Sequence, residues 1–376
     1  MSTNRLLIAA AGSGKTKFII DNVLTNKTER MLITTFTLAN ERSIRERLAV
    51  ANGGFLPSNL TIQTWFSFLI EHGIRPYRYW NERVNGMIFC SEPSGIKYSY
   101  KNGRKIIKVR WGEEENLKKH YFDKNMNVYS DKLSKLFYRC NEKSNGYVIK
   151  RLEKVFKNIY IDEVQDMAGW DLELIRLILR STISLTMVGD PRQTVYLTHH
   201  DDKYKKYKYG KVKEFIQEKC TRKNEYCYID TETLCSSYRN IEQICILSSK
   251  LYPSISACSS SLTKTNSHVG IYFVHMCEVE KYYKLYKPIQ LRLRQDVELP
   301  IDVPSMTFGM SKGLEAEHVL IYPTSDMLKW LSGQKINFAP KTQAQLYVAL
   351  TRAFFSVGIV VDDDFNKKID GIKMWQ

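Results

Sequence analysis

Several features are missing from this sequence of 376 residues, and each absence narrows the class of protein. No apolar run reaches the length of about eighteen residues that a membrane-spanning helix needs, so we expect none. The first residues do not resemble a secretory signal, because the apolar stretch Leu6–Ala11 is short and leads directly into a glycine-containing loop. No internal repeat is visible.

Paired cysteine motifs are also missing, although the chain has 8 cysteines. None forms a C-x-x-C pair, and their spacings fit neither a zinc module nor the disulfide scaffold of a small secreted domain. We therefore expect free thiols in a cytoplasmic protein.

Positive charge is abundant, with 56 Lys and Arg against 40 Asp and Glu and a formal net charge of +16. Such a surplus favours a polyanionic partner, most simply nucleic acid, because Lys and Arg neutralise phosphates. A generally basic surface is the alternative. With 43% hydrophobic residues, the chain has enough apolar side chains for a sizeable core and for two or three domains.

Short apolar runs alternate with helical patterns along much of the chain. Residues 5–11 and Met31–Phe36 are typical of buried strands, and each is followed by a segment with helical character. This alternation predicts an α/β protein with parallel sheets covered by helices. Further strands are expected at residues 158–161, 184–188, 269–274, 319–322 and 357–361.

Two segments rich in lysine and tyrosine interrupt this pattern. Residues 71–146 have little clean periodicity, and we interpret them as an inserted subdomain. Residues 203–213 interleave lysines with tyrosines, which suits single-stranded nucleic acid because rings stack on bases while lysines neutralise phosphates. For both segments, a solvated charged surface is the alternative.

A glycine-rich loop near the start of the chain carries the strongest chemical signal. It reads Ala-Ala-Ala-Gly-Ser-Gly-Lys-Thr from Ala9 to Thr16, between an expected strand and an expected helix. That context is typical of a phosphate-binding loop, whose backbone N–H groups contact the phosphates. Lys15 is expected to reach the β- and γ-phosphates, and the Thr16 hydroxyl to bind Mg²⁺. We assign nucleotide contacts to Ala11, Gly12, Ser13, Gly14, Lys15 and Thr16.

Two acidic residues follow another apolar strand, in the sequence Ile-Tyr-Ile-Asp162-Glu163-Val-Gln-Asp. This is the Walker B pattern, in which Asp162 would hold Mg²⁺ and Glu163 would act as the general base for the attacking water. A helix cap is the alternative reading of two acids after a strand. A third strand ends in Gly189-Asp-Pro-Arg-Gln193, which is positioned to sense the γ-phosphate.

With these three motifs and several that follow, the sequence resembles the UvrD/Rep-like superfamily 1A DNA helicases, whose motifs appear in the same order over nearly the whole chain. The DExxQD form at 162–166 is more specific than a generic acidic pair. Further similar motifs are Thr35-Phe36-Thr37, Thr64–Phe68, Ser237–Asn240, Thr307–Glu315 and Gln345–Ala353.

The resemblance implies roles for individual residues. Tyr238 would stack on adenine, and Glu315 would touch the ribose. Arg239 and Arg352 would reach the γ-phosphate as arginine fingers, and Gln193 would bridge nucleotide and DNA. The residues that the resemblance places along the single strand are Phe36, Thr64, Phe66 and Tyr196. For each aromatic, a core position is the alternative.

The sequence departs from the family pattern at several positions. Eight residues precede Ala9, so we expect the adenine-reading glutamine motif to be absent. Gly309 replaces the usual motif V histidine. Only 67 residues separate Arg239 from Thr307, where larger members insert a domain called 2B. We expect a short form with RecA-like lobe 1A at 1–70 and 147–222, a 1B-like insertion at 71–146, and lobe 2A at 223–376.

The resemblance implies an ATP- and Mg²⁺-dependent translocase or helicase that is expected to move 3′→5′ on single-stranded or tailed DNA and to hydrolyse ATP between two lobes. Short members of this family occur beside nucleases in anti-phage systems such as Gabija. A nucleotide- or DNA-end-sensing ATPase subunit that regulates a nuclease partner in antiviral defence is therefore the alternative. A replication or recombination partner and an RNA-directed motor are further alternatives.

Overall fold

The computed structural model describes residues 4–77, 84–90, 94–103, 105–198 and 202–376. They cluster into two compact units, which are considered separately below. Unit 1 contains residues 4–6, 16–189 and 197–229, as far as they are described, and unit 2 contains residues 7–15, 190–196 and 230–376. The chain therefore passes between the units several times.

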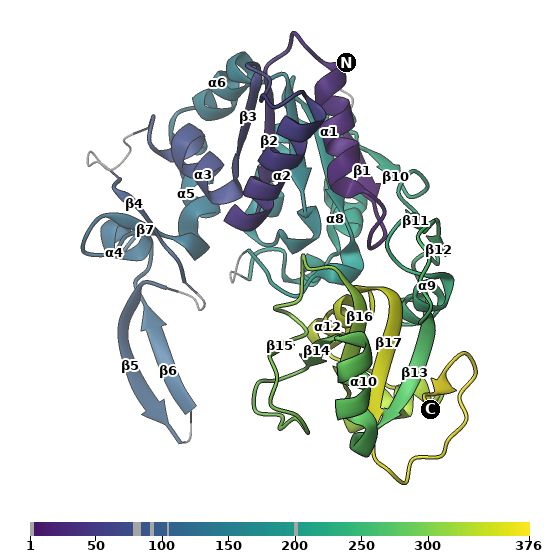
Figure 1. Cartoon of the computed structure of the whole chain (residues 1–376). Coiled ribbons are helices and arrows are strands. Elements are labelled where there is room, and N and C mark those ends of the chain that lie inside the picture. The colour runs from purple at the N-terminus through teal and green to yellow at the C-terminus, as the bar shows by residue number, and fades with distance from the viewer. Residues whose placement is uncertain (1–3, 78–83, 91–93, 104, 199–201) are drawn as a thin grey trace. The chain divides into compact units, whose positions relative to one another are not determined.

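The first six-stranded sheet has the strand order β10-β1-β9-β8-β2-β3 (Figure 1). Its central strands are parallel, and β2 is buried along its whole length because it has a strand on each side and helices over its faces. The bounds are β1 (Arg5–Ile8), β2 (Met31–Thr35), β3 (Leu60–Thr64), β8 (Asn158–Asp162), β9 (Ser184–Gly189) and β10 (Tyr228–Asp230).

Helices connect the strands of this sheet, as the alternating pattern predicted. The helix α2 begins at a threonine cap, because the Thr37 side chain accepts a hydrogen bond from the Asn40 N–H. The helices are α1 (Lys15–Thr25), α2 (Leu38–Ala51), α3 (Trp65–Phe68), α5 (Leu133–Lys143), α6 (Tyr147–Val155), α7 (Trp170–Leu179) and α8 (Val212–Lys219). Short helical turns are η1 (Leu69–Ile74), η2 (Ser130–Lys132), η3 (Val164–Asp166), η5 (Lys205–Tyr207) and η6 (Lys223–Glu225).

Two small sheets and a helix lie within the segment that the sequence marked as an insertion. The strands β4 (Gly86–Ile88) and β7 (Asn127–Tyr129) pair in parallel. The antiparallel hairpin of β5 (Ile96–Asn102) and β6 (Lys105–Arg110) extends away from them, and α4 (Leu117–Tyr121) follows (Figure 1).

The basic segment at 203–213 differs from its sequence interpretation. The rings of Tyr204 and Tyr207 pack against Phe215, with centroids 5.0 and 5.4 Å apart, and the Tyr204 hydroxyl donates a hydrogen bond to Glu173. Tyr207 is buried in unit 1 and Tyr204 is half-buried. The ring of Tyr207 is therefore not accessible for stacking on a base, whereas Tyr209 is exposed.

The second six-stranded sheet has the order β15-β14-β16-β17-β13-β18 and is parallel throughout. Its strands are β13 (Gly270–His275), β14 (Ile289–Arg292), β15 (Ser305–Thr307), β16 (Ala316–Tyr322), β17 (Ala353–Val361) and β18 (Lys373–Met374). The helices of this unit are α9 (Glu242–Ser249), η7 (Met276–Glu278), α10 (Val279–Tyr286), α11 (Ser325–Leu331) and α12 (Pro340–Leu350).

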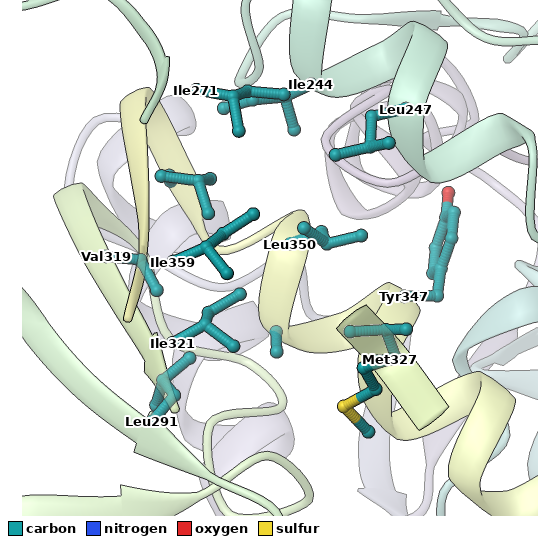
Figure 2. Close-up of a cluster of buried hydrophobic side chains, with 14 of the residues drawn as sticks. Ile244, Leu247, Ile271, Leu291, Val319, Ile321, Met327, Tyr347, Leu350 and Ile359 are labelled. Carbon is teal, nitrogen blue, oxygen red and sulfur yellow. The ribbon is translucent and has the colours of Figure 1, made fainter. Parts of the chain in front are cut away.

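The two faces of the second sheet are covered by different helices, because successive strand side chains point to opposite faces. Val319, Ile321 and Ile359 pack with side chains of α9, α11 and α12 in the larger core (Figure 2). Leu320 and Val360 point the other way and pack with α10.

Two six-stranded parallel sheets confirm the predicted α/β class, as expected for two RecA-like lobes with small additional sheets. Residues 240–306 are all described, and they contain α9, α10 and the strands β12 (Ser259–Ser260), β13, β14 and part of β15. The strand β12 pairs with β11 (Ser236–Ser237). All 8 cysteines are free thiols. None of the helices in the described residues is long and apolar enough to cross a membrane.

Candidate nucleotide-binding site

The glycine-rich loop joins β1 to α1, as predicted. Gly12 and Gly14 have φ angles of 70° and 83°, in the left-handed region that glycine enters without steric cost. Ser13 is buried between them, and its hydroxyl has no hydrogen-bond partner among the described residues. An unpartnered buried hydroxyl is costly unless a ligand satisfies it. The loop therefore fits a phosphate group that accepts a hydrogen bond there.

The loop is held against the segment that the sequence assigned to adenine and γ-phosphate contacts. The Tyr238 N–H donates to the Gly12 carbonyl at 3.0 Å. A Cβ atom at Gly12 would lie 2.4 Å from the Arg239 Cβ and 2.7 Å from the Ser237 Oγ. Only glycine fits this close approach, so the backbone conformation of the loop and the position of Arg239 depend on each other.

Asp190 is the hub of a buried network behind the loop. Its Oδ1 accepts hydrogen bonds from the Arg192 backbone and side chain, and its Oδ2 accepts from the Gln193 amide at 2.9 Å. The Tyr347 hydroxyl donates to the same Oδ2 at 3.1 Å and accepts from the Ala11 N–H at 3.4 Å. The network thus connects α12 to the phosphate loop.

The Arg192 side chain holds the backbone at the start of the phosphate loop. Its Nη2 donates to the Ala9 carbonyl at 3.0 Å, and its side chain is 3% exposed. Burial alone would lower the pKa of the Arg192 guanidinium, but the adjacent Asp190 carboxylate more than offsets this and raises it. Arg192 therefore stays charged and holds the loop carbonyl in place.

Arg352, the predicted arginine finger that follows α12, is 2% exposed. Its Nε donates to the Val348 carbonyl at 3.1 Å and its Nη1 to the Leu314 carbonyl at 3.0 Å. Its Nη2 lies 3.5 Å from the Gln193 side-chain oxygen. Arg352, which the resemblance assigned to the γ-phosphate, thus contacts Gln193, which it assigned to a bridge between nucleotide and DNA. Gln193 connects Arg352 to the Asp190 network.

Arg239 and Glu315 form an ion pair, with the Arg239 Nε 3.1 Å from the carboxylate and its Nη2 also bonded. The sequence assigned these two residues to different parts of the nucleotide, and the fold brings them together. The Tyr238 side chain beside them is 64% exposed, so its ring is open to stacking.

Tyr196, a predicted nucleic-acid contact, is 47% exposed. A Cβ atom at Gly309 would lie 3.1 Å from its hydroxyl and 3.4 Å from the Gln345 amide nitrogen. The Tyr196 hydroxyl therefore occupies the space in which a side chain at position 309, such as the usual motif V histidine, would begin.

The acidic pair lies in unit 1, at the end of β8. Asp162 is 4% exposed, and its Oδ1 accepts a hydrogen bond from the Glu163 N–H at 2.9 Å. Glu163 has a φ of 57°, which is uncommon for a residue with a side chain and often marks a functional position. The Gln165 amide donates to the Glu163 carboxylate. The buried Gln165 thus orients the predicted general base.

The remaining predicted nucleic-acid contacts cluster at the ends of β2 and β3. The rings of Phe36 and Phe66 meet edge to face with centroids 5.3 Å apart. Thr64 caps α3 by accepting from the Ser67 N–H at 3.2 Å. Phe66 is 9% exposed and Phe36 is half-buried, so Phe36 has the more accessible ring.

The predicted Mg²⁺ ligands Thr16 and Asp162 both belong to unit 1. A hydroxyl and a carboxylate are the hard oxygen donors that Mg²⁺ prefers, together with water and substrate phosphates. The described residues contain no group of three or more His, Cys, Asp or Glu side chains that could hold a metal by themselves. This donor set fits an ion that arrives with a nucleotide.

Four residues of the site were not assigned individually from the sequence: Gln165, Asp190, Arg192 and Tyr347. All lie inside recognised motifs, so their positions carried a signal. The burial of Asp190, Arg192 and Tyr347 could not be predicted from the sequence. It depends on the contact between the 190–196 segment and α12, and Asp190 and Tyr347 are more than 150 residues apart in the chain.

Comparisons with known proteins agree with the motif order. The UvrD/REP helicase N-terminal domain family matches residues 1–88 and 102–200. The chain is 25% identical over 236 residues to the ATP-dependent DNA helicase Rep of Buchnera aphidicola subsp. Schizaphis graminum, covering 51% of this chain and 35% of that protein. It is 24% identical over 246 residues to a probable DNA helicase II homolog of Mycoplasma capricolum, covering 50% and 32%.

The chain therefore spans about a third of the length of the curated relatives it matches. Among solved structures, arterivirus nonstructural protein 10 (helicase) is similar with a TM-score of 0.46 and 13% identity, over 96% of this chain and 60% of that one. From the family match and the two relatives we conclude that residues 1–88 and 102–200 are homologous to the N-terminal domain of the UvrD/Rep superfamily 1 helicases.

Proposed function

We propose that this protein is an ATP-dependent translocase or helicase that acts on single-stranded or tailed DNA in the 3′→5′ direction. The observation that carries the ATP part is the phosphate loop, with two left-handed glycines around a buried, unpartnered Ser13 hydroxyl. Such a loop supplies oriented N–H groups to phosphates and leaves one hydroxyl donor that a phosphate oxygen can satisfy.

The remaining nucleotide contacts follow from the groups around the loop. Lys15 neutralises the β- and γ-phosphates, Tyr238 offers an exposed ring to the base, and Glu315 contacts the ribose. Arg239 exchanges its pairing with Glu315 for the γ-phosphate when the nucleotide binds. A charged group recruited in this way stabilises negative charge in the transition state of phosphoryl transfer.

The hydrolytic step uses the residues at the end of β8. Glu163 accepts the proton of the attacking water, and Gln165 keeps its carboxylate in position. Thr16 and Asp162 hold Mg²⁺, which supplies charge neutralisation at the phosphates when bound. Gln193 and Arg352 connect the occupancy of the γ-phosphate position to α12 through the Asp190 network.

Two observations support nucleic acid as the partner. The net charge is +16, and the two curated relatives are named as DNA helicases. Phe36, Thr64, Phe66 and Tyr196 are the proposed contacts to the strand.

Hydrolysis of ATP with and without single-stranded DNA tests the proposal. We expect stimulation by DNA, with matched RNA less effective. The variants Lys15→Ala and Glu163→Gln are expected to lower the turnover by about a hundredfold or more, because each removes a group that acts in the transition state. Strand-stimulated hydrolysis that survives either substitution would contradict the proposal.

A second candidate is a nucleotide- or DNA-end-sensing ATPase subunit that regulates a nuclease partner in phage defence. Residues 240–306 favour this second candidate. They form strands and helices of unit 2 and contain no further domain at the position where larger family members insert 2B. Duplexes with 3′ and 5′ tails separate the two candidates. Robust unwinding of the 3′-tailed duplex by the isolated chain supports the helicase, and ATP hydrolysis without unwinding supports the regulatory subunit.

A further inference from the structure

A cavity of about 770 Å³ lies in unit 1, away from every residue assigned above. It is formed by the end of α5, the loop at 143–147, the first turns of α6 and Tyr77. Its lining includes Lys143, Lys150, Arg151, Lys154, Tyr77 and Tyr147. We call it the α5–α6 cavity.

The α5–α6 cavity carries a concentration of positive charge. Within the described part of the chain, Lys150, Arg151 and Lys154 form no ion pair, and the Arg151 Nη1 is buried without a hydrogen-bond partner. Glu153, the one acidic side chain among the described lining residues, accepts a hydrogen bond from the Thr182 N–H at 2.8 Å. Among the residues that the structure describes, these three cations therefore have no matching anion.

Some lysines elsewhere in unit 1, unlike Lys150 and Lys154, have an acidic partner. Lys17 pairs with Asp21 at 2.6 Å, and Lys206 pairs with Glu218. Like charges gathered around a cavity repel one another and raise the free energy of the fold by themselves. A bound anion would remove this repulsion.

An aromatic side chain stands at the rim of the cavity. The Tyr147 side chain is 61% exposed, and the Lys150 Nζ lies 4.9 Å from its ring centroid. The Tyr77 hydroxyl donates to the Tyr147 carbonyl at 2.8 Å and fixes the backbone of this residue at the start of α6. An exposed ring beside a lysine is the combination that holds a base and its phosphate in single-strand binding sites.

We propose that the α5–α6 cavity binds a segment of nucleic-acid strand, with phosphodiester groups at Lys150, Arg151 and Lys154 and a base against Tyr147. The volume exceeds what a single phosphate needs and suits a nucleotide unit of a strand. The inference deepens the proposed function, because it identifies a strand contact outside the motif residues. It rests on that function only for the preference for single-stranded DNA.

The role of the cavity lysines is tested by the binding of a fluorescent single-stranded DNA of about 20 nucleotides. Binding is measured by fluorescence anisotropy in the absence of ATP. The double variant Lys150→Ala/Lys154→Ala is expected to weaken binding about tenfold. It should also make the dependence of log Kd on log salt shallower by about 1.4, because each phosphate contact to a single strand contributes about 0.7. Lys335→Ala/Lys367→Ala is the matched control, since both lysines are exposed and lie in unit 2. Equal effects of the two double variants would overturn the proposal.

A second pair of variants tests the ring. Tyr147→Ala is expected to lose about tenfold in affinity, as for one base that loses its stacking partner, whereas Tyr147→Phe should bind like the native protein. The bond from Tyr77 goes to the backbone of residue 147, so both variants keep it. Equal losses in both variants would contradict stacking.

Competition with AMP and with inorganic phosphate distinguishes a strand from a small phosphate ligand. If the site binds a strand, neither compound at millimolar concentration should displace the oligonucleotide from it. Displacement should therefore not differ between the native protein and the variant Lys150→Ala/Lys154→Ala. Displacement that does differ would overturn the proposal in favour of a small ligand. Because DNA binding is measured without ATP, its loss in the variants is independent of hydrolysis, and a failure of the ATPase proposal would be seen separately with Lys15→Ala.

Discussion

The Tyr347 hydroxyl donates to Asp190 Oδ2 at 3.1 Å and accepts from the Ala11 N–H at 3.4 Å. One phenol thus connects α12 to both the phosphate loop and the 190–196 segment. Tyr347 is 1% exposed, and burial, followed by the nearby Asp190 charge, raises the pKa of its hydroxyl well above the usual value. It therefore stays protonated near neutral pH and can act as a hydrogen-bond donor.

Tyr347→Phe is expected to destabilise unit 2 by about 1–2 kcal/mol, because a buried carboxylate loses one donor. It should also lower ATP turnover, since the loop N–H at Ala11 loses its acceptor. Urea unfolding and steady-state hydrolysis measure the two effects. Tyr272→Phe removes a hydroxyl from β13 in the same unit, where it donates to the Val269 carbonyl, and should leave hydrolysis unchanged. Normal turnover in Tyr347→Phe would show that the bridge is not needed for catalysis.

Gly12→Ala is expected to abolish nucleotide binding, because the added Cβ would meet the Arg239 Cβ at 2.4 Å. Gly53→Ala is the matched control. Its φ of 67° is close to the 70° of Gly12, but a Cβ atom there meets nothing within 4 Å. Both variants lose about 1 kcal/mol from the left-handed conformation, and only Gly12→Ala should lose binding of a fluorescent ATP analogue. Retained binding in Gly12→Ala would contradict the close packing of the loop.

Ser13→Ala should have opposite effects on stability and on ligand affinity. Without nucleotide, the free energy of unfolding is expected to stay unchanged or to rise by about 1 kcal/mol, because a buried hydroxyl without a partner is removed. The affinity for ATP should fall, because the phosphate loses a donor. Thermal unfolding with and without ATP measures both, since ligand binding raises the melting temperature. A loss of stability with unchanged affinity would mean that the hydroxyl serves the fold.

The buried His268 predicts a loss of stability in weak acid. Burial, and then the nearby His318, lowers the pKa of His268 to about 4. Its ring is stacked on Tyr286 at 3.7 Å, and its Nε2 lies 2.9 Å from the Tyr282 hydroxyl. The unfolded chain binds the proton at a pKa near 6.5, so between about pH 6.5 and 4 it carries more protons than the native protein does.

Stability should therefore fall as the pH falls through this window, by up to about 1.4 kcal/mol per pH unit. Urea midpoints measured between about pH 7.5 and 4.5 report the slope. In His268→Gln the slope should become shallower, even if the variant is less stable throughout. An unchanged slope would show that other groups cause the acid sensitivity.

Local patterns were sufficient for the elements that carry chemistry. The strands before the phosphate loop and before Asp162 were recognisable because buried parallel strands are continuous apolar runs, and their polar ends stand out. Thr64 was expected on the nucleic-acid path, and the fold gives it a capping role in α3 as well. For Tyr207, composition was misleading, because alternating lysines and tyrosines do not reveal which face of a segment Phe215 will cover.

The sequence by itself determined the α/β class, the order of the motifs and the chemical type of each site residue, because these depend on neighbours within a few positions. Only the tertiary structure decided which of these residues touch. Arg239 with Glu315, Tyr347 with Asp190, and Arg352 with Gln193 are each separated by more than 70 residues of chain. Such contacts depend on strand order and helix packing, which the local pattern leaves open. The same holds for Lys150, Arg151 and Lys154 of the α5–α6 cavity, which form no ion pair within the described residues. A charge in the sequence does not say whether a partner will lie beside it.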